Sequence, residues 1–187
     1  MTESAKNPIS PAKKRWAETL LYVFIGLILA FLVRMVIEPT IVVGDSMFPT
    51  LEDGQYLINY KLAYKTEEPE FGDIVIVEPE NAPTDGRLIK RVIGLPGDTV
   101  EIKNDELYLN GKKLEEPYIR EPMKKTENLK VKLGKDEIFV MGDNRNNSLD
   151  SRFIGPINYK KEVRGKVVLR IFPFDQSFKD SIHPVGK

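Results

Sequence analysis

The sequence predicts a mostly β protein that follows a single N-terminal transmembrane helix. Residues 16–37 are almost entirely apolar, and a helix needs about 20 such residues to cross the hydrocarbon core of a bilayer. From Ile41 onward, short β-branched runs alternate with turn residues, which is typical of antiparallel strands. The chain has 187 residues, enough for one domain with a small insertion and an appended segment.

The apolar segment is preceded by a basic head, residues 1–15, in which Lys and Arg outnumber a single glutamate. Residues 20–33 carry no charge, and Glu38-Pro39 ends the apolar pattern. Because basic residues favour the cytoplasmic side, we expect a cytoplasmic head at 1–15, a transmembrane signal anchor at 16–37 and an extracytoplasmic remainder. A buried core helix is one alternative, but in so small a domain it would carry a polar stripe, which residues 20–33 lack. A cleaved signal peptide is the other, but it would need small residues soon after the apolar run, and the nearest small-x-small pattern, Gly44-Asp45-Ser46, lies too far beyond it.

The exported part should form an antiparallel β domain made of residues 38–102 and 137–187. Pro96-Gly97 suits a type II turn, and Asn110-Gly111 between "ELYL" and "KKL" predicts a hairpin. The Lys- and Glu-rich stretch 103–136 is interpreted as a small inserted β subdomain or flap. Strands are expected at 42–43, 55–61, 73–78, 87–93, 99–103, 137–141 and 165–172.

Composition excludes several classes of protein. Lys+Arg and Asp+Glu are equal at 28 each, so the chain offers no basic field for nucleic acid. The absence of cysteine excludes a disulfide scaffold, a thiolate enzyme and a Cys-ligated zinc site. The stretch "GDNRNNSLDSR" resembles a calcium loop only superficially, because Arg145 stands where a ligand is needed. No metal and no organic cofactor are expected.

Ser46, in the stretch "VVGDSMFPTL", is a candidate nucleophile that needs a base. The only histidine, His183, lies in a Pro- and Gly-bearing C-terminal tail, so the base must be a carboxylate or a lysine. A lysine with an ordinary pKa near 10.4 is charged at neutral pH, so a lysine base must be desolvated. Lys90 stands among apolar residues in "RLIKRVIGLPGD" and is the best candidate.

Four motifs, "GDSMFPTL", "FGDIVIV", "LIKRVIGLPGD" and "MGDNRNNSLDSRFIG", follow the anchor in this order. Together they resemble the successive boxes of type I signal peptidases, in the single-span form of Gram-positive bacteria. The resemblance implies two antiparallel β-sheet regions, a fold shared with LexA-like repressors, with Ser46 as the nucleophile and Lys90 as the general base. Ser148 would orient the lysine, and a set of charged residues would support the site: Arg91, Asp143, Arg145, Asp150 and Arg152.

Two residues depart from the family pattern. Asn146 stands where many members carry aspartate, which removes a charge beside the supporting network. Gly44 stands where Gram-negative members have a serine whose hydroxyl helps to form the oxyanion hole, so here backbone N–H groups would have to serve.

The resemblance implies a membrane-bound serine endopeptidase that removes N-terminal signal peptides from preproteins emerging from the secretion translocase, through an acyl-enzyme. Its partners would be these preproteins and membrane lipid. The enzyme would cut after small residues at positions −1 and −3, and the pocket walls would come from Val42, Val43, Gly44, Met47, Leu88 and Ile89. One alternative is a self-cleaving Ser-Lys repressor-type protease, against which the anchor argues. The other is a catalytically inactive, membrane-tethered binding module, which the presence of Ser46 and Lys90 disfavours.

Overall fold

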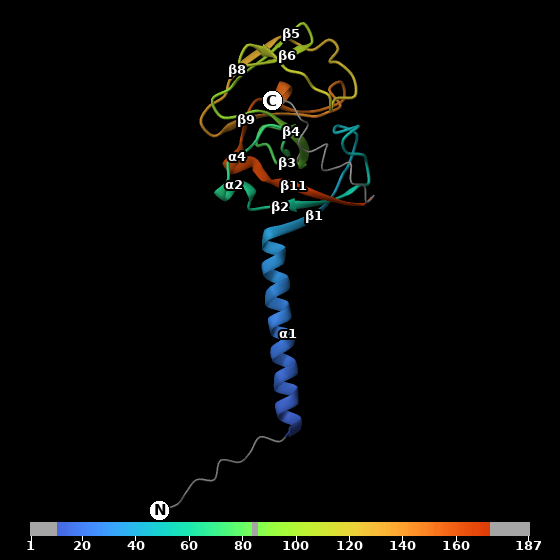
Figure 1. The fold of residues 1–187 in the computed structure, drawn as a ribbon, viewed down its shortest axis with the longest axis vertical. Coiled ribbons are helices and arrows are strands. Elements are labelled where there is room, and N and C mark those ends of the chain that lie inside the picture. The colour runs from blue at the N-terminus through green and yellow to red at the C-terminus, as the bar shows by residue number, and fades with distance from the viewer. Residues whose placement is uncertain (1–10, 84–85, 173–187) are drawn as a thin grey trace, which may run out of the picture. The chain divides into compact units, whose positions relative to one another are not determined.

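The computed structural model describes residues 11–83 and 86–172 (Figure 1). Residues 1–10 of the basic head, residues 84–85 and the tail 173–187, which includes His183, lie outside the described residues. The chain divides after Val36 into two compact units.

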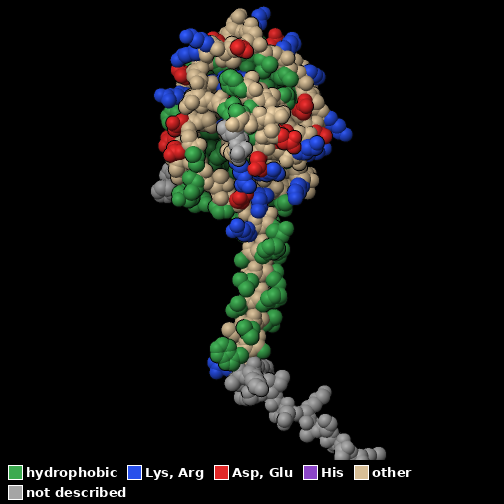
Figure 2. All heavy atoms as spheres, turned by 180° about the vertical axis from the view of Figure 1, so that it is seen from behind, with side chains coloured by type: hydrophobic (Ala, Val, Ile, Leu, Met, Phe, Trp, Pro, Cys, Tyr) green, Lys and Arg blue, Asp and Glu red, His purple; other side chains and the backbone are tan. Residues whose placement is uncertain are grey.

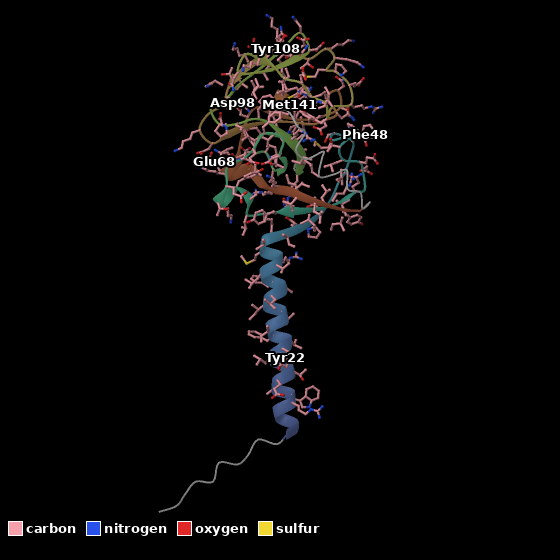
Figure 3. All side chains as sticks on the ribbon, viewed as in Figure 1. Tyr22, Phe48, Glu68, Asp98, Tyr108 and Met141 are labelled. Atoms are coloured by element: carbon pink, nitrogen blue, oxygen red, sulfur yellow. The ribbon has the colours of Figure 1, made fainter. Side chains whose placement is uncertain are left out.

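The first unit is helix α1, Pro11–Val36. It begins at Pro11 rather than at residue 16, so residues 11–15 are helical; proline is well tolerated in the first turn of a helix, where its missing N–H would be unpaired anyway. Within the described residues, α1 is the one helix long and apolar enough to span a membrane, with mean hydropathy 2.4 over Arg15–Val36. Hydrophobic side chains cover it (Figure 2), and Tyr22 projects from it (Figure 3). These properties fit a membrane anchor.

The second unit begins with the larger of two antiparallel sheets. Seven of the described strands form it, in the order β1-β2-β11-β3-β4-β9-β10. Three helices of a single turn lie between its strands: α2 (Ala63–Thr66), α3 (Ser151–Ile154) and α4 (Tyr159–Glu162). The strands are β1 (Ile37–Ile41), β2 (Tyr56–Tyr60), β3 (Ile74–Val77), β4 (Leu88–Gly94), β9 (Glu137–Met141), β10 (Ile157–Asn158) and β11 (Val163–Phe172).

The smaller sheet has the order β7-β6-β5-β8 among the described strands. Its hairpin turns at Asn110 and Gly111, whose positive φ angles of 53° and 80° are those that this turn type requires. The sheet starts with β5, so it begins before the expected insertion at residue 103 and takes in a strand that the sequence assigned to the main β domain. Its strands are β5 (Thr99–Lys103), β6 (Glu106–Leu109), β7 (Lys112–Lys113) and β8 (Leu129–Lys132).

The strand expected at 42–43 is wrong, because the strand in this region is β1 and ends at Ile41. After Val43 the chain turns through Gly44, whose φ of +84° lies in the left-handed region that disfavours residues with a side chain. The other strand predictions are confirmed with small shifts of their ends. Strand β10 was missed because it has only two residues. Strand β8 alternates apolar and charged residues, but it is four residues long and lies in the Lys- and Glu-rich stretch that was interpreted as an insertion or flap.

Three buried clusters form the core of the second unit. One of them holds the loop after β1 against the larger sheet, because Met47 and Leu51 pack with Ile74 and Ile76 of β3. Another joins the two sheets, since it contains Phe139 of β9 together with residues of β5 and β6. Apolar contacts with the larger sheet therefore hold the loop that carries Ser46 in place.

Candidate active site

The loop that carries Ser46 is fixed on both sides of the serine. Before it, the Gly44 N–H donates to Asp53 Oδ1 at 2.7 Å. After it, Met47 is 1% exposed and holds the loop in the core. The Asn144 N–H donates to the Ser46 carbonyl oxygen at 3.0 Å, so the loop after β9 also positions the serine backbone.

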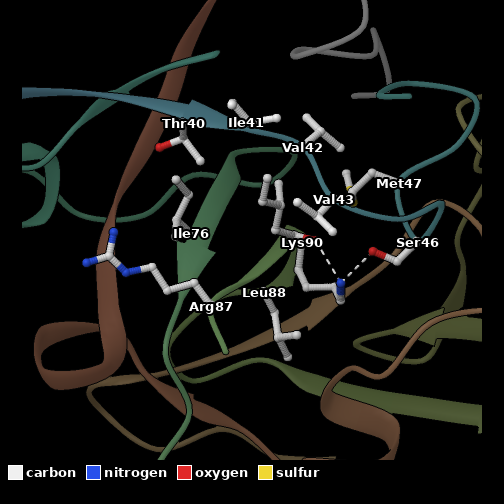
Figure 4. Close-up of a pocket in the computed structure, with 11 residues that line it drawn as sticks. Thr40, Ile41, Val42, Val43, Ser46, Met47, Ile76, Arg87, Leu88 and Lys90 are labelled. Atoms are coloured by element: carbon white, nitrogen blue, oxygen red, sulfur yellow. Dashed lines mark hydrogen bonds between the residues drawn. The ribbon is translucent and has the colours of Figure 1, made fainter. Parts of the chain in front are cut away.

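Lys90 lies in β4, opposite Val75 of β3, and is only 2% exposed. Its Nζ donates to Ser46 Oγ at 2.7 Å and to the Ile89 carbonyl oxygen at 2.8 Å (Figure 4). Burial lowers the pKa of Lys90 to about 8, although the negative charges of Asp150 and Asp143 act in the opposite direction. About a tenth of this lysine is therefore neutral at pH 7, and the neutral form is the one that can act as a general base.

A pocket of about 300 Å³ opens beside the Ser46–Lys90 pair (Figure 4). Five of the six residues expected to form its walls line it: Val42, Val43, Met47, Leu88 and Ile89. Gly44 is not among its lining residues. The sequence did not point to four other residues that line it, Thr40, Ile41, Ile76 and Arg87.

Two buried ion pairs lie behind the site. Arg91 Nε donates to Asp143 Oδ1 at 2.8 Å and Nη2 donates to Oδ2 at 2.7 Å, with both side chains fully buried. Arg152 forms a similar bidentate pair with Asp150, whose Oδ2 also accepts the Gly142 N–H at 3.0 Å. Such pairing satisfies charges that would be costly to bury alone. Asp143 and Asp150 are also the carboxylates that act on the pKa of Lys90.

Arg145 and Ser148 lie in the same loop after β9. Arg145 Nε donates to the Gly142 carbonyl oxygen at 3.0 Å. The Ser148 hydroxyl is buried and makes no hydrogen bond within the described residues, so its expected bond to Lys90 stays a prediction. No group of His, Asp or Glu side chains in 11–83 and 86–172 has the arrangement of a metal site.

The family model described as "Signal peptidase, peptidase S26" matches residues 14–172. The chain belongs to this family. A signal peptidase I from Bacillus licheniformis is 41% identical over 94% of this chain and 97% of its own length. Signal peptidase I P from Bacillus subtilis subsp. natto is 44% identical over 86% of this chain and 90% of its own. A solved structure of a signal peptidase I from Enterococcus faecalis is 30% identical and covers 55% of this chain and 98% of its own, with a TM-score of 0.46.

Membership of the signal peptidase family makes the protein a peptidase, as the four sequence motifs predicted, and the apolar helix α1 fits its anchoring in a membrane. The structure also shows contacts that sequence reasoning missed. Asn146 donates from Nδ2 to Glu121 Oε1 and to the Pro122 carbonyl oxygen at 2.9 and 3.1 Å. Its Oδ1 accepts the Lys124 N–H at 2.9 Å. A carboxylate here would lose both donated bonds and would face Glu121, so asparagine suits the position.

Proposed function

We propose that this protein is a membrane-anchored endopeptidase that removes signal peptides from exported preproteins, with Ser46 as nucleophile and Lys90 as general base. The observation that carries the proposal is the 2.7 Å hydrogen bond between Lys90 Nζ and Ser46 Oγ, made by a lysine whose pKa burial lowers to about 8. A nucleophile and a base within hydrogen-bond reach are the requirement for covalent catalysis.

The neutral Lys90 amine takes the proton of Ser46 as Oγ attacks the scissile carbonyl carbon. The resulting lysine ammonium gives that proton to the departing amine, and the C–N bond breaks to leave an acyl-enzyme on Ser46. Lys90, neutral again, then deprotonates a water molecule that attacks the ester. Collapse of this second intermediate returns the proton to Ser46 Oγ and releases the signal peptide with a free carboxylate. The Ser46 N–H is a donor for the developing oxyanion.

The proposed cleavage after small residues at positions −1 and −3 places two alanine-like side chains in this pocket. Its volume is about 300 Å³, and Val42, Ile76, Leu88 and Ile89 supply apolar walls. An extended peptide that runs beside residues 42–43 would add backbone hydrogen bonds and would point alternate side chains into this space. Val43 is 86% exposed and therefore open to such a peptide.

Residues 38–187 would lie on the outer face of the membrane, with the basic head in the cytoplasm. The substrates would be preproteins emerging from the translocase, and membrane lipid would surround α1. The pocket-lining residue Thr40 lies four residues after the end of α1 at Val36 in the sequence, which supports cleavage close to the membrane surface.

The test is to incubate the detergent-solubilised full chain with a preprotein that has alanine at −1 and −3, and to sequence the new N-terminus. We expect one cut directly after the −1 alanine, none with phenylalanine at −1, and none with the Ser46→Ala variant. Cleavage at an unrelated bond, or a Ser46→Ala variant as active as wild type, would contradict the proposal.

A further inference from the structure

Residues 116–124, between β7 and β8 of the smaller sheet, contact the loops that carry the active site. The sequence predicted that this segment belongs to a small inserted β subdomain or flap rather than to the core. In the structure, Arg120 Cζ lies 5.0 Å from the ring centre of Phe48, in the Ser46 loop, and the backbone of Pro122 and Lys124 bonds to Asn146. Figure 3 labels Phe48 in that loop. The 116–124 segment therefore reaches both the Ser46 loop and the loop after β9.

The strongest of these contacts is the pair between Glu116 and Arg145. Arg145 Nη1 donates to Glu116 Oε2 at 2.6 Å, and Nη2 lies 2.6 Å from Oε1. The Arg145 side chain is fully buried and that of Glu116 is 7% exposed. Burial alone would lower the pKa of Arg145, but the adjacent Glu116 carboxylate reverses this and raises it. Removing the carboxylate would leave a buried cation without its counter-charge.

The remaining edge of the Arg145 guanidinium faces the active site, because Nε donates to the Gly142 carbonyl oxygen at 3.0 Å. Gly142 packs directly on the serine: a Cβ atom at this glycine would lie 2.4 Å from the Ser46 carbonyl oxygen and 2.3 Å from Ser148 Oγ. The contact from Glu116 through Arg145 to Gly142 therefore ends on the backbone of the nucleophile.

Tyr118 fixes the geometry of this pair. Its ring centre lies 4.4 Å from Arg91 Cζ and 5.9 Å from Arg145 Cζ, so one buried ring contacts both guanidiniums. Its hydroxyl donates to Glu116 Oε1 at 3.0 Å, which orients the carboxylate toward Arg145.

We propose that Glu116 is a positioning residue for catalysis, an inference that rests on the proposed role of Ser46. Glu116 holds the Arg145 guanidinium, which holds the Gly142 carbonyl group, which keeps the Ser46 backbone in place, and so Ser46 Oγ stays within reach of Lys90 Nζ. Since a displacement of 1 Å at reacting atoms can cost about a hundredfold in rate, loosening this contact should lower kcat. Glu116 does not line the substrate pocket, so KM should not change.

The test compares Glu116→Gln with Glu106→Gln in the full chain. Glu106 is a matched control, because it also pairs with a cation, Lys113, and accepts a tyrosine hydroxyl, that of Tyr108 at 2.7 Å, but it lies 42% exposed on the smaller sheet. We expect Glu116→Gln to lower kcat at least tenfold per folded molecule with KM within twofold of wild type, and Glu106→Gln to change neither. A purely structural role would lower the melting temperature and leave kcat per folded molecule unchanged, which would overturn the proposal.

A double-mutant cycle with Arg145→Lys tests the route of action. Lysine keeps the charge but cannot hold Glu116 with two donors while donating from an Nε to Gly142. Arg145→Lys should lower kcat by itself, and adding Glu116→Gln should lower it less than twofold further. If Glu116→Gln lowered kcat equally in wild type and in Arg145→Lys, Glu116 would not act through Arg145. A wild-type kcat in Arg145→Lys would also refute action through Arg145, and this result holds even if Glu116→Gln does not fold. If the wild-type chain failed to cleave a preprotein, the proposed function would be at fault; a cleaving wild type with an unaffected Glu116→Gln would refute this inference alone.

Discussion

Raising the pH from 7 to 9 should increase the rate of cleavage about tenfold. Only neutral Lys90 can accept the Ser46 proton, and burial places its pKa at about 8. With that pKa the neutral fraction is about 9% at pH 7 and about 91% at pH 9. With the ordinary value of 10.5 the neutral fraction at pH 7 would be about 0.03%, so burial raises the supply of active base roughly 300-fold.

The assay measures initial rates of cleavage of a short fluorogenic peptide that lacks titratable groups, at concentrations well below KM. Under these conditions kcat/KM follows the ionisation of the free enzyme. A plot of log(kcat/KM) against pH should rise with a slope of one below pH 8 and level off above it. If kcat/KM did not change between pH 7 and 9, or if its rise were centred near pH 10, a buried Lys90 would not be the base.

Four further predictions concern stability, topology and chemistry. Lys90→Met should be more stable than wild type at pH 7, because the pKa of Lys90 is about 8 in the folded protein and 10.5 in the unfolded chain, which destabilises the fold below pH 8. This cost disappears as the pH rises through 10.5, so urea unfolding should show the advantage of Lys90→Met shrinking by about 2.5 kcal/mol between pH 7 and pH 10. A difference that is constant with pH would contradict this. Gly44→Ala should cost about 1–2 kcal/mol in thermal unfolding, since its φ is +84° with open space around it, and an unchanged melting temperature would disprove the strain. Protease added outside intact protoplasts should digest residues 38–187, whereas protection of this region would reverse the topology. Chelators, thiol reagents and His183→Ala should each leave the rate unchanged, because the chain has no cysteine and its single histidine lies in the C-terminal tail; a large loss from any of them would indicate other chemistry.

The β-rich fold was predictable because its strands are short, β-branched and separated by strong turn signals. The Asn110-Gly111 hairpin is an example, since the residue pair itself determines the turn. The prediction of a strand at 42–43 was wrong. Two valines favour a strand, but the sharp turn at Gly44 depends on the hydrogen bond of its N–H with Asp53, which the local sequence does not show.

The pairing of Ser46 with Lys90 was suggested by apolar neighbours and by family motifs, but their distance follows only from the fold. The role of Glu116 was hidden for a different reason. It lies in a Lys- and Glu-rich stretch that is typical of a solvated surface, and its burial depends on Arg145, a residue distant in sequence. Such long-range charge pairing leaves no local signal in a single sequence.

The most direct test of the Ser46–Lys90 mechanism is the cleavage rate of a folded Lys90→Arg variant, with Lys130→Arg as the control. Lys130 is an exposed lysine of the smaller sheet that pairs with Glu101, so its replacement should have no effect. Arginine keeps the positive charge but stays protonated at any usable pH, and loss of a general base costs about a hundredfold or more. We predict that Lys90→Arg retains less than about a hundredth of the wild-type rate. A folded Lys90→Arg enzyme with more than about a tenth of that rate would contradict the mechanism.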